Sequence, residues 1–241
     1  MALNLLELKD IEEFTNLDPT ELASHVVTQE EVRHLFELCD ALWLHSGDVS
    51  QPHAELTSGK CSNGYIDCGR PLRRSYLCQF LGEQLAKKLR ASYPDLSIDW
   101  VVGSDHAGAV ISHSTAIALG TKHEFTEKFE STQQLWKRVA LESTEIVLQV
   151  EELITTTQTL QAVREGIRSG NTNPVTFAPV VLTMIHRSPV YELEGSPILY
   201  LAHYDINVWE PSECSLCAQG SQRLRPKQHW KELTNDIFHR S

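Results

Sequence analysis

The feature that most limits the fold of this chain is the alternation of short apolar runs with polar turns and helices from Ile98 onward. Residues 98–102 (IDWVV) precede the loop GSDHAG and an apolar helix, and residues 146–150 (IVLQV) precede EELITTTQT and the helix LQAVREGI. A third apolar run, FAPVVLTMI, covers residues 177–185. Uninterrupted apolar strands that alternate with helices predict a mainly parallel sheet with helices on both faces, so the predicted fold class is α/β.

Two loops of this pattern lie where ligands bind in such sheets, at the carboxyl ends of strands. They cover residues 103–108 and 151–159. The second loop has two carboxylates and then hydroxyls at the mouth of a helix: Glu151, Glu152, Thr155, Thr156, Thr157 and Thr159. A helix N-terminus binds phosphate through backbone N–H groups, and carboxylates bind a sugar diol or Mg²⁺. A Thr-rich helix cap preceded by two exposed acids is the alternative interpretation.

The N-terminal half is predicted to be helical around a loop-rich stretch. Thr28 and Glu31 form a capping box that begins a helix, and its apolar stripe extends over residues 32–43. Residues 46–69 are rich in turn-forming residues and are predicted to be a loop. Apolar residues recur at helical spacing again over residues 77–89, which predicts a second amphipathic helix.

Charge and hydropathy exclude some classes of function. The chain has 21 Lys and Arg against 32 Asp and Glu, which gives a net charge of −11. General nucleic-acid binding is not expected, because that activity needs a basic surface. The N-terminus mixes acids into its apolar residues, and no stretch approaches the roughly 18 apolar residues of a membrane span. We therefore expect a cytoplasmic protein without a membrane partner.

Six cysteines are too few and too unevenly placed for a disulfide scaffold, so reduced thiols are expected. Cys214 and Cys217 form one CxxC pair, which supplies two of the four ligands of a structural zinc ion. Cys61 and Cys68, or His229, complete such a site only if the C-terminal tail folds back onto the segment around Cys61. A turn of reduced thiols is the favoured interpretation.

Several motifs carry a resemblance to a known family. VEELITTTQT (150–159) resembles the phosphoribosyl pyrophosphate (PRPP) motif of type I phosphoribosyltransferases, with divergent positions. From about Thr28 to Lys227 the chain is most similar to bacterial orotate phosphoribosyltransferases, and the matching motifs occur in the family's order. They are HAELTSGKCS (53–62), YIDC (65–68), VVGSDHAG (101–108), FTEK (125–128), LWKR (135–138), MIHRS (184–188) and ECSLC (213–217).

The resemblance implies a Rossmann-like type I phosphoribosyltransferase core of about residues 69–190 together with a small hood. The domains expected from it are an N-terminal helical extension (1–28), a phosphoribosyltransferase-like domain (29–227, with the hood from about 29–68 and 191–227) and a C-terminal tail (228–241). It also implies a homodimer. Leu5, Leu8, Ile11 and Phe14 offer an additional apolar face for that contact.

The resemblance further implies transfer of ribose 5-phosphate from PRPP to a pyrimidine-type base such as orotate, with Mg²⁺. The residues carried over as catalytic are Lys128, Lys137 and Arg138. Those carried over for PRPP are Glu151, Glu152, Thr155, Thr156, Thr157, Thr159, Gly103 and Asp105. Those carried over for the substrate are Ser58, Lys60, Tyr65, Thr155 and Arg187, the last facing a carboxylated base. No protein ligand to a metal is assigned.

Several positions depart from the family pattern, among them Thr57 and Gln158, and three of them bear most on activity. Glu152 stands where the family usually has Asp, and Asp105 stands where it has an apolar or small residue, so a negative charge lies beside pyrophosphate. Thr157 stands where the phosphate loop normally has Gly, which predicts either a distorted loop or a Thr with positive φ at a cost of about 1–2 kcal/mol. Each change opposes tight PRPP binding. A catalytically silent relative, acting as a nucleotide- or phosphate-binding regulator or scaffold, therefore remains the alternative to an enzyme.

Overall fold

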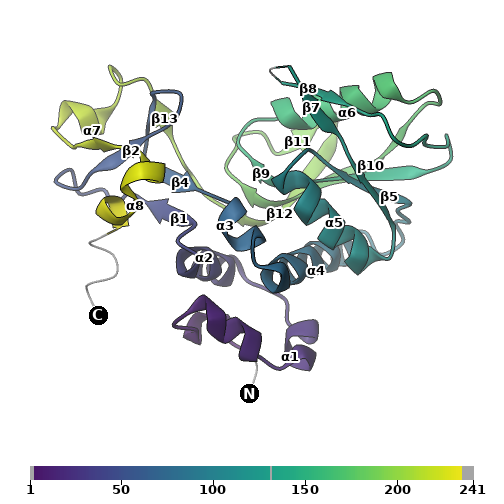
Figure 1. The fold of residues 1–241 in the computed structure, drawn as a ribbon, viewed down its shortest axis with the longest axis horizontal. Coiled ribbons are helices and arrows are strands. Elements are labelled where there is room, and N and C mark those ends of the chain that lie inside the picture. The colour runs from purple at the N-terminus through teal and green to yellow at the C-terminus, as the bar shows by residue number, and fades with distance from the viewer. Residues whose placement is uncertain (1–2, 131, 235–241) are drawn as a thin grey trace. The chain divides into compact units, whose positions relative to one another are not determined.

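A computed structural model describes residues 3–130 and 132–234 and divides the chain into two compact units (Figure 1). The first unit comprises the residues up to Leu35 together with Cys68–Tyr204. The second comprises Phe36–Asp67 together with the residues from Asp205 onward. Each unit is therefore built from two separate stretches of sequence.

A six-stranded sheet forms the centre of the first unit (Figure 1). In spatial order its strands are β11 (Glu192–Leu193), β12 (Ser196–His203), β10 (Thr176–His186), β9 (Ile146–Ile154), β5 (Trp100–Gly103) and β6 (Lys122–Phe125). All neighbouring pairs are parallel except β11 with β12. The predicted α/β class with a mainly parallel sheet is confirmed.

Helices cover both faces of this sheet. Figure 1 shows α4 (Ser75–Ser92) and α5 (Ala107–Leu119) together on one side and α6 (Gln158–Gly170) on the other, with the short α3 (Gly69–Leu72) beside α4. On the α6 side, Val163 and Ile167 pack against Val102 of β5 and Val147 of β9. The two strand residues come from the apolar runs that predicted the sheet, and burial of all four side chains supplies the main stabilising term of this layer.

Gly82 of α4 lies against the backbone of α5. A Cβ at this position would lie 2.6 Å from the carbonyl carbon of Ser114. Gly82→Ala gains about 1 kcal/mol of helix propensity, yet it forces the two helices apart, which costs about 2–3 kcal/mol because the contact is with backbone. We expect urea denaturation to show a net loss of stability of about 1–2 kcal/mol. The neighbouring Glu83→Ala is the control, with an expected change within about 0.5 kcal/mol; equal stability of Gly82→Ala and the wild type would refute the prediction.

The N-terminal segment of the first unit packs on its own chain. It contains the 3₁₀ turns η1 (Leu5–Glu7) and η2 (Ile11–Asn16) and the helix α1 (Pro19–Ser24). Leu5, Leu8, Ile11 and Phe14 are all buried. The Phe14 ring stacks on Tyr76 and meets Phe80 edge to face, at centroid distances of 5.8 and 5.2 Å. The expectation that these four residues offer an open face for a dimer contact is therefore wrong, because their side chains are already buried within the chain.

The helix α2 (Gln29–Leu38) begins as predicted and ends earlier than its apolar stripe. Its capping box forms in both directions: Glu31 N–H donates to Thr28 Oγ1 at 3.1 Å, and Thr28 N–H donates to a Glu31 carboxylate oxygen at 2.8 Å. Asp40 adopts a positive φ of 53°, which breaks the helix. The end of the predicted stripe, Leu42 and Trp43, consequently lies in a strand.

The second unit is made of short strands and two helices. The strands are β1 (Leu42–Leu44), β2 (His53–Glu55), β3 (Cys61–Ser62), β4 (Gly64–Ile66), β13 (Val208–Trp209) and β14 (Arg223–Leu224), and the helices are α7 (Ser215–Ala218) and α8 (Pro226–Thr234). A four-stranded sheet has the order β13-β3-β2-β14, and β1 pairs with β4. The stretch predicted as a loop thus contains three strands, and the C-terminal segment folds back onto two of them.

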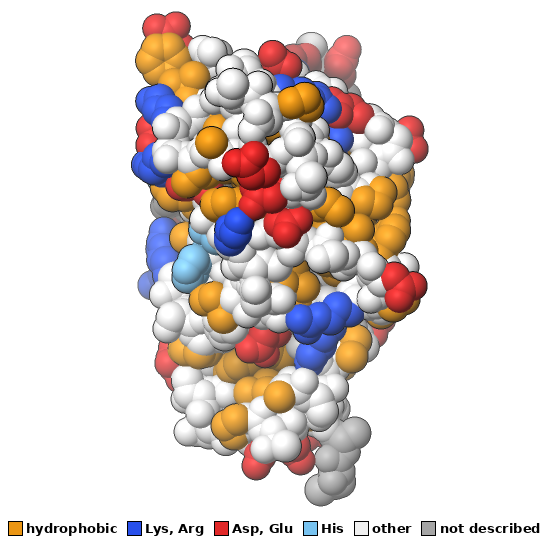
Figure 2. All heavy atoms as spheres, turned by 90° about the vertical axis from the view of Figure 1, so that its right-hand side faces the viewer, with side chains coloured by type: hydrophobic (Ala, Val, Ile, Leu, Met, Phe, Trp, Pro, Cys, Tyr) orange, Lys and Arg blue, Asp and Glu red, His pale blue; other side chains and the backbone are white. Residues whose placement is uncertain are grey.

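The surface of the described residues carries mixed charge. On the face drawn in Figure 2, Lys and Arg side chains are interspersed with acidic and apolar ones. Across residues 3–130 and 132–234, no helix combines the length and apolar character that crossing a bilayer requires.

Candidate functional site

The carboxyl ends of β5, β9 and β10 bring the predicted site residues of the first unit to one edge of the sheet. Gly103 ends β5, Glu151 and Glu152 lie near the end of β9, and Arg187 directly follows β10. The Arg187 N–H donates to Ile154 O at 2.9 Å, which fixes the start of one loop to the end of the next strand. This edge is where an open parallel sheet binds ligands.

Glu151 is a buried carboxyl group held by one residue of the neighbouring loop. Only 2% of Glu151 is exposed, and its two oxygens accept from Ser104, from N–H at 3.1 Å and from Oγ at 2.6 Å. Burial raises the pKa of Glu151 to about 8, and the nearby Glu152 carboxylate adds to the rise. A cation or several hydroxyl donors at this edge would favour the ionised form.

Two glycines allow this packing. A Cβ on Gly108 would lie 2.7 Å from Glu151 Oε2, and a Cβ on Gly103 would lie 2.7 Å from the Gly108 carbonyl carbon and 2.6 Å from Ser112 Oγ. A side chain at Gly103 would meet the backbone of α5 and displace the helix, whereas one at Gly108 would push aside the Ser104 hydroxyl and the Glu151 carboxyl group. Gly103, predicted to contact PRPP, therefore also has a packing role in bringing the N-terminus of α5 against β5 and β9.

Glu152 and Asp105 add two more acids to the edge. Burial raises the pKa of Glu152, a backbone hydrogen bond opposes the rise, and the Asp105 carboxylate adds to it. Asp105 Oδ2 lies 2.6 Å from His106 Nδ1. His106 has φ 57° and ψ −111°, an unfavourable conformation for a residue with a Cβ. The strained position in this site is therefore His106.

The Thr-rich loop leads from β9 into α6 without strain at Thr157. Thr155 and Thr157 are half-buried, and Thr156 and Thr159 are exposed. Thr157 is the N-cap of α6 with φ −82° and ψ 2°. Of the two predicted outcomes, a distorted loop or a Thr with positive φ, the structure excludes the positive φ. Its side chain makes no cap hydrogen bond. The hydroxyl and the first N–H groups of α6 are thus available to an anion.

The three basic residues carried over as catalytic follow β6. Lys128 lies in β7 (Glu127–Phe129), which forms a hairpin with β8 (Gln133–Leu135). Lys137 Nζ lies 3.2 Å from a Glu127 oxygen, and Arg138 pairs with both Glu127 and Glu124. Lys137 and Arg138 are therefore bound to neighbouring carboxylates. Within the part of the chain that the structure describes, Lys128 has no such ion pair.

Gln134 joins this hairpin to the Asp105 loop, and the sequence patterns did not single it out. Its Oε1 accepts from Thr126 Oγ1 at 2.8 Å, and its Nε2 lies 3.5 Å from Asp105 Oδ1. Gln134 is 5% exposed. A buried amide in an otherwise exposed hairpin is the signal of a fixed contact, but it is visible only once burial is known.

The remaining predicted substrate residues lie in the second unit. Ser58 is exposed in the turn between β2 and β3, and Lys60 Nζ pairs with Glu210 at 2.8 Å. Tyr65 packs against Trp230 with ring centroids 6.1 Å apart. Tyr65 also lines a pocket of about 200 Å³ with Arg225 and neighbouring residues.

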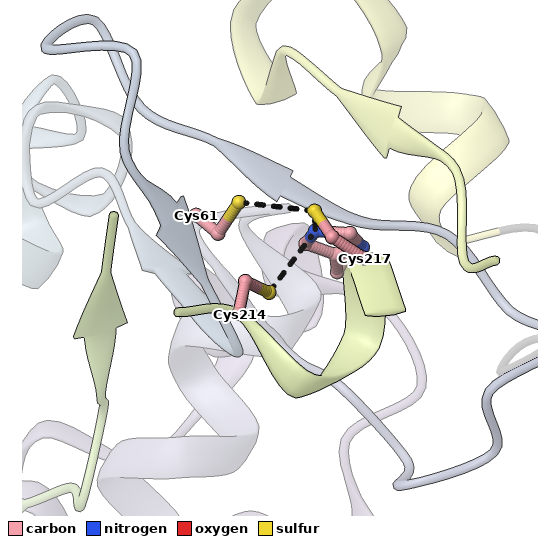
Figure 3. A group of neighbouring side chains, drawn as sticks. Cys61, Cys214 and Cys217 are labelled. Carbon is pink, nitrogen blue, oxygen red and sulfur yellow. Dashed lines mark hydrogen bonds between the residues drawn. The ribbon is translucent and has the colours of Figure 1, made fainter. Parts of the chain in front are cut away.

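The six cysteines are free thiols, as expected. Cys61 and His53 lie beside Cys214 and Cys217, and all four ligand atoms lie within 4.8 Å of one another (Figure 3). Cys68 is elsewhere: its Sγ lies 3.7 Å from Glu152 O in the first unit. His229 pairs with Glu232 at 2.8 Å. The C-terminal segment does fold back onto the segment around Cys61, but the histidine in the cluster is His53 and not His229.

The chain is similar over most of its length to known proteins of one kind, although no protein-family model matches it. An orotate phosphoribosyltransferase of a Nitratiruptor species is 25% identical over 196 residues, which are 78% of this chain and 96% of that protein. One of Desulforamulus reducens is 28% identical over 185 residues, 77% of this chain and 93% of that protein. The crystal structure of Mycobacterium tuberculosis orotate phosphoribosyltransferase in complex with inorganic phosphate aligns with a TM-score of 0.52 at 18% identity, over 73% of this chain and 95% of that chain.

Proposed function

We propose that this chain, which is a relative of the orotate phosphoribosyltransferases and has the type I phosphoribosyltransferase fold, transfers ribose 5-phosphate from PRPP to a pyrimidine-type base such as orotate. The observation that carries the proposal is the order of groups after β9. An acidic pair, the buried Glu151 and the half-buried Glu152, is followed within a few residues by the open N-terminus of α6. A ribose phosphate presents hydroxyls and a phosphate in that same sequence.

Each group at the edge has a chemical part in this reaction. The Glu151 and Glu152 carboxylates accept hydrogen bonds from the ribose hydroxyls, and the residues 155–159 hold the 5′-phosphate with N–H and hydroxyl donors. Positioning the sugar in this way leaves its anomeric carbon open to attack by a base nitrogen as positive charge develops there. Lys128, Lys137 and Arg138 neutralise the departing pyrophosphate.

A divalent cation fits the donor set. Glu151, Glu152 and Asp105 place three carboxyl groups at one edge, two of them with raised pKa values, and oxygen ligands of this kind suit Mg²⁺. When bound with PRPP, Mg²⁺ supplies positive charge to the pyrophosphate oxygens. The repulsion between Asp105 and pyrophosphate would be reduced by a cation held at this edge.

Calorimetric titration with PRPP and Mg²⁺, followed by assay of orotate-dependent pyrophosphate release, tests the function. We expect saturable binding of PRPP and release of pyrophosphate only when orotate is present. Glu152→Gln should weaken PRPP binding about tenfold or more, because it removes a charged acceptor. Glu165→Gln, on the exposed side of α6, is the matched control and should bind as the wild type does. A folded wild-type protein that does not bind PRPP would overturn the proposal.

Arg187 is expected to determine the preference for a carboxylated base. A bidentate pair between its guanidinium group and a carboxylate contributes about 1.5–3 kcal/mol per bond at most. Arg187→Ala should therefore weaken orotate strongly while changing PRPP binding much less, as measured by titration of each ligand separately. Equal loss of both ligands would mean that Arg187 has a structural role.

One argument for a catalytically silent protein, a strained Thr157, does not hold. Glu152 and Asp105 still depart from the family pattern, but Thr157 carries no positive φ. No contact among the described residues specifically favours a regulator or scaffold over an enzyme. The homodimer and the cytoplasmic location stay predictions, and sedimentation of the purified protein tests the first of them.

A further inference from the structure

We propose that the second unit holds a structural zinc ion bound by His53, Cys61, Cys214 and Cys217. The four side chains come from β2, β3 and the start of α7, and Figure 3 shows the three thiols converging from these segments. His53 and Cys61 are 0% exposed and Cys214 is 2% exposed. Three thiolates with one imidazole are a common ligand set of structural zinc. This site is independent of the proposed transferase activity.

The spacing of the ligand atoms matches a tetrahedral metal centre. With Zn–S bonds of about 2.3 Å and a Zn–N bond of about 2.0–2.1 Å, a regular tetrahedron separates two sulfurs by about 3.8 Å and a sulfur from the nitrogen by about 3.5 Å. The Cys61 and Cys217 Sγ atoms are 3.5 Å apart. His53 Nε2 lies 3.6 Å from Cys214 Sγ and 3.4 Å from Cys217 Sγ. Three of the six ligand-atom pairs thus have nearly tetrahedral spacing, and all six lie within 4.8 Å.

A hydrogen-bond chain orients the imidazole for metal binding. Ser221 Oγ donates to Gln51 O at 2.6 Å, so its oxygen accepts from His53 Nδ1–H, 2.8 Å away. Assigning the Nδ1 proton from this network leaves the Nε2 lone pair facing the thiols. Metal-bound histidines typically donate their second N–H in this way. The chain thereby fixes both the tautomer and the ring orientation that a zinc ligand needs.

A disulfide explains the cluster less well than a metal. A disulfide bond is about 2.05 Å long, and the Cys61–Cys217 separation of 3.5 Å is that of free thiols. One disulfide would also not explain why the third thiol and the imidazole lie in the same cluster. A metal engages all four groups at once.

The second unit has a reason to need a metal. Its strands are two or three residues long, and one of its core clusters contains only Trp43, Ala54, Leu224 and Leu233 as buried members. Small units with little apolar core are often stabilised by metals. Zinc here would join Cys61 to Cys217, 156 positions later in the sequence. The metal would therefore tie the returning C-terminal segment to β3.

Metal analysis of the purified chain of 241 residues by mass spectrometry tests the proposal directly. We expect about one zinc ion per chain after gel filtration. Cys61→Ser and Cys217→Ser should lose most of it, whereas Cys78→Ser, a buried cysteine of α4 outside the cluster, should retain it. His53→Cys should also retain it, because four thiolates still complete the tetrahedron. Removal of zinc by a chelator should lower the unfolding temperature of the wild type and of Cys78→Ser alike.

Two further measurements keep the test decisive if a ligand variant fails to fold. Cobalt added to the chelator-treated wild type should give the visible absorption of a tetrahedral site with thiolate ligands. Ser221→Ala, which removes the partner of the imidazole, should weaken zinc binding about 10–100-fold without abolishing it. Folded wild-type protein without stoichiometric zinc, zinc removed by gel filtration alone, a different stoichiometric metal, or equal zinc in Cys61→Ser and Cys78→Ser would each overturn the assignment.

Discussion

Glu151→Gln is expected to make the protein more stable at alkaline pH and to weaken its binding of PRPP with Mg²⁺. The amide keeps an oxygen that accepts from Ser104 N–H, and its NH₂ group donates to Ser104 Oγ, so the buried contacts survive. The change removes the burial of a negative charge. It also removes a charged acceptor for the sugar, which should weaken PRPP binding about 10–100-fold.

The direction of the pH dependence follows from the raised pKa of Glu151, about 8 in the folded protein against an ordinary value of 4.5. Between these values the folded protein binds more protons than the unfolded chain. The stability of the wild type therefore falls as pH rises through this window, and the loss is complete above pH 8. Glu151→Gln does not show this loss of stability, because its amide does not titrate. The gain at alkaline pH is on the order of a few kcal/mol, which raises the unfolding temperature by several degrees.

Thermal unfolding monitored by circular dichroism near pH 5 and near pH 9 measures this effect. We expect Glu151→Gln and the wild type to differ little at the acidic pH and clearly at the alkaline pH. Glu165→Gln provides the control, since its exposed carboxylate should not change stability with this pH profile. A variant that is equally stabilised at both pH values, or not stabilised at all, would show that Glu151 is not a buried titrating group.

The edge that carries the candidate site could be predicted because it depends on local patterns. The apolar run of β9 and the helical period of α6 place Glu151, Glu152 and the Thr-rich loop between them. Parallel pairing then brings the loop after β5 to the same edge. No contact between distant side chains needed to be known for this step.

Other features depend on pairings that leave no periodic signal. The meeting of Cys61 with Cys217 requires β13 to pair with β3 and β14 with β2, and these strands are two or three residues long. Likewise, the apolar stripe after Val32 continues at helical spacing into Trp43, although the helix has ended and the chain has turned at Asp40. Spacing alone does not distinguish these cases.

The ion pairs of the predicted catalytic cations are a third feature that sequence patterns did not predict, because their partners are carboxylates of neighbouring strands. Lys137 and Arg138 pair with Glu127 and Glu124, so in this state part of their charge is already compensated. Ion pairs at partly exposed positions contribute only about 0–1 kcal/mol. A pyrophosphate group with several negative charges can therefore compete for these side chains. The ion pairs thus position the segment but are weak enough for Lys137 and Arg138 to exchange their glutamate partners for pyrophosphate.

Lys128 differs from these two, and this difference gives the second large expected effect. Within residues 3–130 and 132–234 it has no carboxylate at salt-bridge distance. It stands opposite Gln134 in the hairpin, whose amide contacts Asp105 in the loop at the end of β5. A cation near that loop compensates both pyrophosphate and the Asp105 carboxylate. Lys128→Ala should consequently lower kcat by about 10²–10³, the usual effect of losing one group that stabilises developing charge.

Comparison of Lys128→Ala with Lys122→Ala separates this effect from a general change in charge. Lys122 begins β6 and pairs with Glu145, so it lies at the amino end of the strand, at the opposite edge of the sheet. Both variants lose one positive charge, but only Lys128 follows the carboxyl end of β6. In orotate-dependent pyrophosphate release, Lys122→Ala should stay near the wild-type rate while Lys128→Ala falls, and PRPP binding should weaken far less than the rate. Equal rates for the two variants would contradict a catalytic role of Lys128. Lys137 or Arg138 would then have to leave its glutamate partners and neutralise pyrophosphate, because these are the other two predicted catalytic cations.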